Sequence, residues 1–186
     1  MLSSMFVAGL LAMQASAALT PEKACGPTYH VFSLDPSHSH PAKTTSLEAL
    51  LSNDVVVEGV VSAKRTYSPG SGVENDITLH VNKILKGHGV PTGGDIMIHV
   101  AGGYAGSSGT CWQDTVDDGA RVAVGTSFLV VLTKEAGSAF YRAYSDASWF
   151  SISSDGSLVP LTPALIRNHA LSDKKIVDIE QRAAKL

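Results

Sequence analysis

A succession of short β-prone segments between residues 54 and 133 constrains the fold of this chain most strongly. Residues 55–63 (VVVEGVVSA) are rich in β-branched side chains, which suit a pleated and half-buried surface. Apolar and polar residues then alternate over 77–82 and 96–100, as in strands with one buried face. Residues 128–132 (FLVVL) are all apolar, which indicates a strand buried on both sides. The order predicts a mainly β fold, a small closed barrel of five to seven strands.

Glycines and polar turns separate these segments. Gly59 interrupts the first strand and predicts a bulge or sharp bend, which a barrel needs in order to close. Asp155-Gly156 predicts a tight turn between two further strands. The glycine- and serine-rich residues 67–72 and 102–109 are predicted to be loops. We expect the barrel domain to span residues 46–160.

Two segments flank the predicted barrel. Residues 18–45 contain four prolines and predict an extended arm, with one edge strand over 29–34. Ser46 is typical of the N-cap of a short helix over 47–51, just before the barrel. Residues 161–186 predict C-terminal helices, one starting at Thr162-Pro163 and one running from Ser172 to 185. In the second, helical spacing puts residues 176, 179 and 183 on one face.

The first 17 residues predict export. They carry no charged side chain, residues 5–13 form an apolar run, and Ala15-Ser16-Ala17 has the small-x-small pattern of a signal peptidase site. The run is too short to cross about 30 Å of hydrocarbon as a helix. We therefore expect a signal peptide over 1–17, a mature chain that starts at Ala18, a secreted or periplasmic location, and no stable membrane insertion after cleavage.

The chain has two cysteines, Cys25 and Cys111. In an exported protein a cysteine pair predicts a disulfide. On the chain-entropy model, a bridge that closes so long a loop stabilises the fold by about 4–5 kcal/mol. It would also hold the N-terminal arm against the barrel. The alternative is a reactive Cys111 thiolate in a hydrolase, although none of the seven histidines lies in a recognisable nucleophile motif.

Composition argues against several classes of partner. Charged residues make up 17% of the chain, below the ~25% of average globular proteins, and the formal net charge is −3. Lysines and arginines are scattered, whereas a nucleic-acid partner requires a concentrated basic face. The sequence predicts no nucleic-acid partner, no cofactor and no catalytic residue.

Several segments resemble a known family. The segments DVVVEGVVSAKR, ITLHVNKILKG, GGDIMIHVAGG and VGTSFLVVLTKE are similar to the oligonucleotide/oligosaccharide-binding (OB) type barrels of netrin-module and metalloproteinase-inhibitor-like proteins and their secreted bacterial relatives. The resemblance covers residues 54–135. It implies an OB-like barrel that acts as a binding or accessory module.

One departure from that family limits what the resemblance implies. In the animal inhibitors a cysteine at the mature N-terminus presents its amine and carbonyl to the protease zinc. Here the expected N-terminus is Ala18, and Cys25 lies seven residues further along. Protease inhibition is therefore not carried over to this chain.

Three patterns suggest chemistry without completing a motif. His38 and His40, with His30, would suit a transition metal, but they lie in the proline-rich arm and lack a rigid frame, so we expect no metal site. The aspartates at 114, 117 and 118 lack the ligand spacing of a calcium loop. Residues 102–109 lack the defining residues of a phosphate loop and of a serine hydrolase elbow.

The aromatic residues are the best binding candidates. Tyr67, Tyr104 and Trp112 fall in or beside predicted loops, where exposed aromatic side chains supply contact area at low entropic cost. For Trp112 the alternative is packing against the neighbouring disulfide, and Trp149 is expected in the core. The sequence thus favours an exported, non-enzymatic module that recognises a protein or a cell-surface polymer. A secreted hydrolase and a metal-binding protein using the N-terminal histidines remain alternatives.

Overall fold

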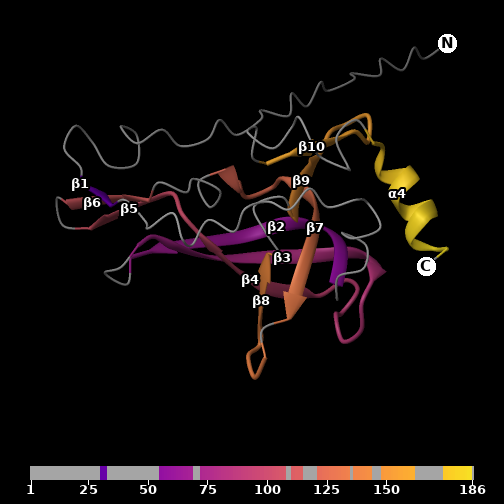
Figure 1. The fold of residues 1–186 in the computed structure, drawn as a ribbon, viewed down its shortest axis with the longest axis horizontal. Coiled ribbons are helices and arrows are strands. Elements are labelled where there is room, and N and C mark those ends of the chain that lie inside the picture. Colours follow the sequence, from indigo (N-terminus) through magenta and orange to yellow (C-terminus); the bar gives the residue numbers. More distant parts are fainter. Residues whose placement is uncertain are drawn as a thin grey trace, which may run out of the picture.

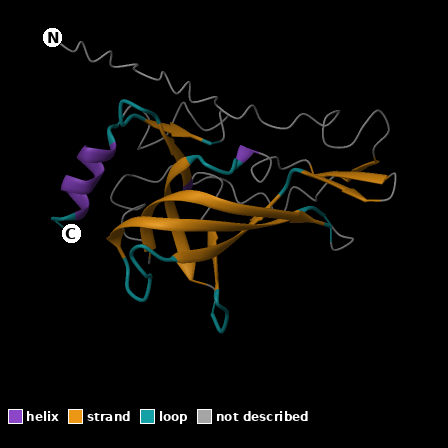
Figure 2. Ribbon diagram, turned by 180° about the vertical axis from the view of Figure 1, so that it is seen from behind, coloured by secondary structure: helices purple, strands orange, loops and turns teal. Residues whose placement is uncertain are grey.

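The computed structural model of this chain describes residues 30–32, 55–68, 72–107, 110–114, 121–134, 136–143, 148–161 and 174–185, with the backbone alone described at 30–32, 107 and 110–114. A long hairpin runs through the middle of the molecule (Figure 1). Helix α4 (Ile176–Ala183) lies beyond one end of this hairpin, and a small three-stranded sheet lies at its other end. Figure 2 shows the same arrangement from behind.

Five strands close into a barrel: β2 (Val55–Tyr67), β3 (Glu74–Lys86), β4 (Asp95–Ala101), β7 (Ser127–Lys134) and β8 (Phe140–Ala143). Neighbouring strands are antiparallel except β4 and β8, which run parallel. Closure depends on β7, because one of its edges pairs with β2 and the other pairs with β8. Numbered in chain order, the barrel strands follow the cyclic order first, second, third, fifth, fourth. The predicted mainly β fold with a closed barrel is confirmed.

The β2–β3 hairpin bends where its register shifts. One of these shifts falls between Glu58 and Gly59. A Cβ atom added at Gly59 would lie 2.5 Å from the His80 carbonyl oxygen and 2.8 Å from Leu79 Cγ. A glycine is therefore needed for the two strands to approach this closely, and the irregularity predicted at Gly59 is confirmed.

Alternate residues of the barrel strands point inward and form its core. The inward residues of β3 and β4 are those predicted from the alternating pattern: Ile77, Leu79, Val81, Ile96, Ile98 and Val100. Trp149 joins this core, is 1% exposed, and meets Phe128 edge to face with ring centroids 5.3 Å apart. Its predicted place in the core is confirmed.

A second apolar layer lies on the outside of the barrel wall. Strands β9 (Trp149–Ile152) and β10 (Leu158–Pro160) extend the sheet from β7, and α4 packs on this extension. Because both faces of β7 are covered, every residue from Phe128 to Leu132 is buried, as predicted. Ile176, Ile179 and Ala183 face this layer, which confirms their predicted common face.

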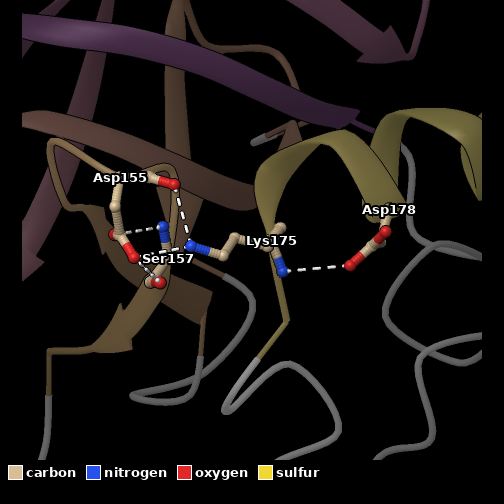
Figure 3. Close-up of polar contacts among 4 residues, drawn as sticks. All are labelled: Asp155, Ser157, Lys175 and Asp178. Carbon is tan, nitrogen blue, oxygen red and sulfur yellow. Dashed lines mark hydrogen bonds and ion pairs between the residues drawn. The ribbon is translucent and has the colours of Figure 1, made fainter.

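A polar latch holds α4 to the turn between β9 and β10 (Figure 3). Lys175 Nζ donates to the Asp155 carboxylate at 2.5 Å and to the Asp155 carbonyl oxygen at 2.9 Å. Ser157 also donates to this carboxylate, through its backbone N–H at 3.0 Å and its hydroxyl at 2.8 Å. Lys175, followed by Ser157, holds the pKa of Asp155 below its usual range. The Asp178 carboxylate reaches back to the Lys175 backbone N–H at 3.3 Å, which supports the first turn of α4.

A second set of charges lies between α4 and the hairpin. Lys83 on β3 pairs with Glu180 on α4 at 2.8 Å, and Glu58 on β2 lies directly opposite Lys83. Burial, followed by repulsion from Glu180, raises the pKa of Glu58, while Lys83 opposes the rise. Glu58 is therefore an unfavourable charge at neutral pH in an otherwise complementary contact.

The prediction that residues 102–109 form a loop is wrong in part. Residues Tyr104–Ser107 form strand β5, which pairs with β6 (Thr110–Asp114), and β1 (His30–Phe32) lies along the other edge of β6. The edge strand expected in the N-terminal arm is therefore confirmed as β1. The glycine and serine of β5 give it no alternating apolar pattern, so the sequence did not indicate a strand that forms by backbone pairing.

Other sequence expectations differ at the boundaries of elements. Strand β2 continues four residues beyond 63, because Arg65, Thr66 and Tyr67 still pair with β3. The tight turn expected at Asp155-Gly156 is present, with Gly156 at φ 80°. The helices expected at 47–51 and from Thr162 lie outside the described residues, and the helix that is described, α4, follows the barrel and begins at Ile176.

Candidate binding face

The three predicted aromatic binding residues lie on strands, not on loops. Tyr67 is the last residue of β2 and is half-buried, and Tyr104 is the first residue of β5 and is also half-buried. Trp112 lies in β6 opposite Ala105, and its side chain is not described. Strands β5 and β6 lie at the end of the hairpin where Tyr67 ends β2 (Figure 1). The structure thus brings the three strands to one end of the molecule.

Of the two cysteines, Cys111 lies among the described residues. Cys25 lies outside the described residues, and the backbone of Cys111 lies in β6. Strand β1 pairs with β6 in parallel, with His30 opposite Trp112. The arm that carries Cys25 therefore runs, five residues later, beside the strand that carries Cys111.

The histidines of the arm give no described metal site. His30 lies in β1, and His38 and His40 lie outside the described residues. Within the part of the chain that is described, no group of three or more His, Cys, Asp or Glu side chains could hold a metal ion. The aspartates at 117 and 118 also lie outside the described residues, and Asp114 ends β6.

Two matching pentapeptides pair across β3 and β4. Residues 76–80 read DITLH and residues 95–99 read DIMIH, and the antiparallel register sets the aspartate of each opposite the histidine of the other. His99 Nδ1 lies 2.8 Å from Asp76 Oδ1, and His80 Nδ1 lies 2.8 Å from Asp95 Oδ1. Because a strand repeats every two residues, each aspartate and histidine lies on the face opposite the buried residues Ile77, Leu79, Ile96 and Ile98.

The two aspartate–histidine pairs have different surroundings. His80 and Asp95 are 46% and 57% exposed at their side chains, whereas His99 and Asp76 are 22% and 20% exposed. The less exposed pair has additional partners. The Tyr67 hydroxyl donates to Asp76 at 3.3 Å, and His99 stacks on Phe140 with centroids 4.0 Å apart and planes at 24°. We call Tyr67, Asp76, His99 and Phe140 the Asp76 cluster.

The Asp76 cluster takes one residue from each of the strands β2, β3, β4 and β8, and the register aligns four residues across these strands, which we call the polar row. Arg65 lies opposite Asp76, Asp76 opposite His99, and His99 opposite Arg142. The Arg65 guanidinium also lies over the Tyr67 ring, 5.6 Å from its centroid. Burial, followed by the charge and hydrogen bond of Asp76, raises the pKa of the Tyr67 phenol. Tyr67 therefore stays a neutral hydrogen-bond donor to Asp76.

An apolar strip runs beside this polar row. Met97 lies opposite Phe140, two residues before the pair formed by His99 and Arg142. The Met97 side chain is 39% exposed and is one of the large apolar side chains exposed among the described residues. We define the β3–β4 face as the outer surface made by the polar row, the apolar strip and the second pair: Arg65, Tyr67, Asp76, Thr78, His80, Asp95, Met97, His99, Phe140 and Arg142.

Two aspartate–histidine pairs are the main polar features of this face. In each pair the carboxylate lies within hydrogen-bond distance of Nδ1 of the imidazole, which fixes the orientation of the ring. The face offers oriented donors and acceptors beside an exposed thioether and stacked rings.

Sequence reasoning missed the Asp76 cluster. The alternation of 77–82 and 96–100 identified Met97, His80 and His99 as outward residues, but not as partners. The signal was the repeated D-I-x-[L/I]-H on two consecutive strands, since a hairpin can place the two copies opposite each other.

No protein-family model matches this chain, and no curated protein is significantly similar to it. Among the described residues, no helix is long and apolar enough to cross a membrane.

Proposed function

We propose that this chain is an exported, non-enzymatic binding module that recognises a protein or a cell-surface polymer through the β3–β4 face and the adjoining end of the hairpin. The observation that carries this proposal is the Asp76 cluster at the surface, where residues of four strands are joined by successive contacts from Tyr67 to Asp76, from Asp76 to His99 and from His99 to Phe140. Partly exposed polar groups held by a rigid sheet lose little conformational freedom on binding.

The topology supports an OB-type barrel. The barrel has five strands in the cyclic order first, second, third, fifth, fourth, with a parallel pair between the third and the fifth. OB barrels bind their ligands on the face of the second and third strands and on the neighbouring loops. In this chain those strands are β3 and β4, which carry both aspartate–histidine pairs.

Export and the disulfide belong to the same proposal. A disulfide requires Cα atoms roughly 4.4–6.8 Å apart, and five extended residues span up to about 17 Å. The chain between Cys25 and His30 is therefore long enough for Cys25 to reach Cys111 beside β1. Thiol titration of the unreduced, denatured mature protein should find no free thiol, and two free thiols would remove this part of the proposal.

The binding function is tested with the mature protein and the native extracellular fraction. The amount of mature protein that binds to the insoluble cell envelope, or to soluble components of the extracellular fraction, is measured for the wild type and for two variants. Met97→Asp places a charge at the centre of the β3–β4 face, and Val159→Asp does so at a similarly exposed strand residue of β10, away from that face.

We expect Met97→Asp to abolish retention and Val159→Asp to preserve it, with both variants as folded as the wild type by circular dichroism. Equal retention of the wild type and Met97→Asp would refute the β3–β4 face as the binding surface.

A further inference from the structure

The two matching pentapeptides make the β3–β4 face complementary to itself. We propose that a second copy of this chain binds this face, in a symmetric dimer whose two-fold axis crosses the strands at Met97. This inference rests on the proposed function and names the protein that the module recognises. Three properties of the face lead to it: the order of its charges, the exposure of its two aspartate–histidine pairs and the state of its backbone groups.

The order of the charges along each strand is the one that a two-fold interface requires. Because every second residue of a strand faces outward, each pentapeptide presents its aspartate, its central residue and its histidine. The central residues, Thr78 in β3 and Met97 in β4, are uncharged and lie opposite each other. In a symmetric interface every contact between two residues is repeated with their roles exchanged. Each strand, with an acid at one end and an imidazole at the other, therefore complements an antiparallel copy of itself.

A two-fold axis across the strands at the central position uses this order. It lays β3 on β3 and β4 on β4 of the second copy, running in opposite directions. Asp76 then faces His80 of the second copy, and Asp95 faces His99 of the second copy. Met97 lies on the axis and faces its own counterpart, so its exposed side chain is covered by another apolar one.

The arginines of the polar row select this axis over the other one that the face allows. An axis along the strands, between β3 and β4, would also set aspartates against histidines. However, Arg65 and Arg142 end the polar row on opposite sides, so that axis would place each over the other arginine of the second copy. Like charges that face each other across an interface are unfavourable. The axis across the strands avoids this contact.

The exposure of the two aspartate–histidine pairs selects the same axis. An axis along the strands would set each pair on its own counterpart, the more exposed on the more exposed. The axis across the strands instead sets the more exposed pair, His80 and Asp95, on the less exposed pair, Asp76 and His99. The more exposed groups of each copy therefore meet the less exposed groups of the other, which favours close contact between the two faces.

The state of the backbone requires that the two copies meet face to face. β4 is paired on both edges at Met97, Ile98 and His99, by β3 on one side and β8 on the other. Association by strand addition needs an open edge, and this part of the sheet has none. The second copy must therefore be recognised by side chains alone.

The experiment is analytical ultracentrifugation of the mature protein from low micromolar to millimolar concentration. The face is small beside the roughly 20–30 residues a side of a standard interface, so we expect a weak dimer that replaces the monomer over this range. Met97→Asp and Met97→Lys should each raise the dimer dissociation constant by at least about tenfold, because each sets like charges on the axis. Val159→Asp and Val159→Lys, at an exposed strand residue of β10 away from the face, should dimerise as the wild type does.

An equal mixture of the two Met97 variants tests the axis itself. If position 97 faces its own counterpart, one copy of Met97→Asp and one of Met97→Lys set opposite charges against each other. The mixture should then form a heterodimer with a dissociation constant at least about tenfold below that of either variant alone. A fluorescent label on one of the two variants identifies this species in the centrifuge.

Three outcomes would overturn the inference: a wild type that stays monomeric at millimolar concentration, a Met97→Asp variant that dimerises like the wild type, or a mixture of the two variants that stays monomeric. The retention experiment separates these outcomes from failure of the proposed function. If a monomeric wild type were retained and Met97→Asp were not, the β3–β4 face would stand as a binding surface and the second copy would be refuted as its partner.

Discussion

Asn75 should be among the most costly polar residues to replace in this fold. It lies in β3, is 1% exposed, and makes three hydrogen bonds. Its Nδ2 donates to the carbonyl oxygens of Val100 at 3.0 Å and Gly102 at 2.7 Å, and its Oδ1 accepts from the Thr66 hydroxyl at 2.7 Å. It therefore joins β2, β3 and the connection from β4 to β5 through one side chain.

Replacing Asn75 by leucine removes all three bonds and leaves the buried carbonyl oxygens of Val100 and Gly102 without this donor, whereas the exposed Thr66 can turn its hydroxyl to water. A typical hydrogen bond contributes about 1 kcal/mol net, and an abandoned buried group costs roughly 1–3 kcal/mol. We expect Asn75→Leu to lower the free energy of unfolding by about 3 kcal/mol, and Thr66→Val, which removes one bond, by about 1 kcal/mol.

Urea titration followed by far-ultraviolet circular dichroism measures both effects. Asn82→Leu is the matched control, because Asn82 lies in the same strand and is exposed, so its replacement should change the free energy by less than about 0.5 kcal/mol. If Asn75→Leu cost no more than Asn82→Leu, the three-bond junction described above would be wrong.

Three further predictions concern the barrel bend and the seat of α4. Gly59→Ala should lower the free energy of unfolding by about 1–3 kcal/mol in urea titration, because its Cβ would lie 2.5 Å from the backbone oxygen of His80; a cost near zero would mean that the strands are not so close. Glu58→Gln should raise stability at pH 7 and have no effect near pH 3: a raised folded pKa means that stability is full below the ordinary carboxyl pKa and is lost as the pH rises through the raised value. A destabilised variant at pH 7 would contradict this reasoning. Lys175→Met should speed amide exchange in α4 but not in the barrel, since it removes the bonds to Asp155. The lowered pKa of Asp155 means that this latch contributes stability above the ordinary carboxyl pKa and loses it as the pH falls through the lower folded value, so the protection factors of the wild-type α4 amides, which correct for the intrinsic pH dependence of exchange, should fall at strongly acidic pH. Unchanged exchange in both cases would show that the apolar contacts of α4 alone hold it.

Much of the barrel could be predicted because its strands pack by side-chain pattern. Apolar and polar residues alternate around Ile77 and Ile98 because these strands have one buried face. The run that ends at Leu132 is apolar throughout because both faces of that strand are buried. Gly59 could be identified because an isolated glycine in a β-branched strand has few explanations other than a bend.

The small sheet could not be predicted in full, for the opposite reason. The serine, glycine and alanine of β5 offer no apolar face, and its strand geometry comes from backbone pairing with β6. The sequence predicted a loop at Tyr67 because the last residues of β2 are polar, yet cross-strand contacts with β3 hold Tyr67 in the sheet.

The Asp76 cluster required knowledge of the register. Asp76 and His99 are 23 positions apart, and a shift of one residue between β3 and β4 would send one of them into the barrel. The register comes from the turn between the strands, where Gly93 and Gly94 bond with Val81, and single-sequence patterns do not fix it.

The most direct test of the β3–β4 face as the binding surface uses its central residue. The full sequence has four methionines, and Met97 is the one that remains in a chain cleaved after Ala17. A mature protein labelled with ¹³C at the methionine methyl should therefore give a single resonance, from the middle of the face. With ligand added until the protein is saturated, we predict that this resonance shifts or broadens; a bound protein whose Met97 methyl resonance stays unchanged would contradict the account.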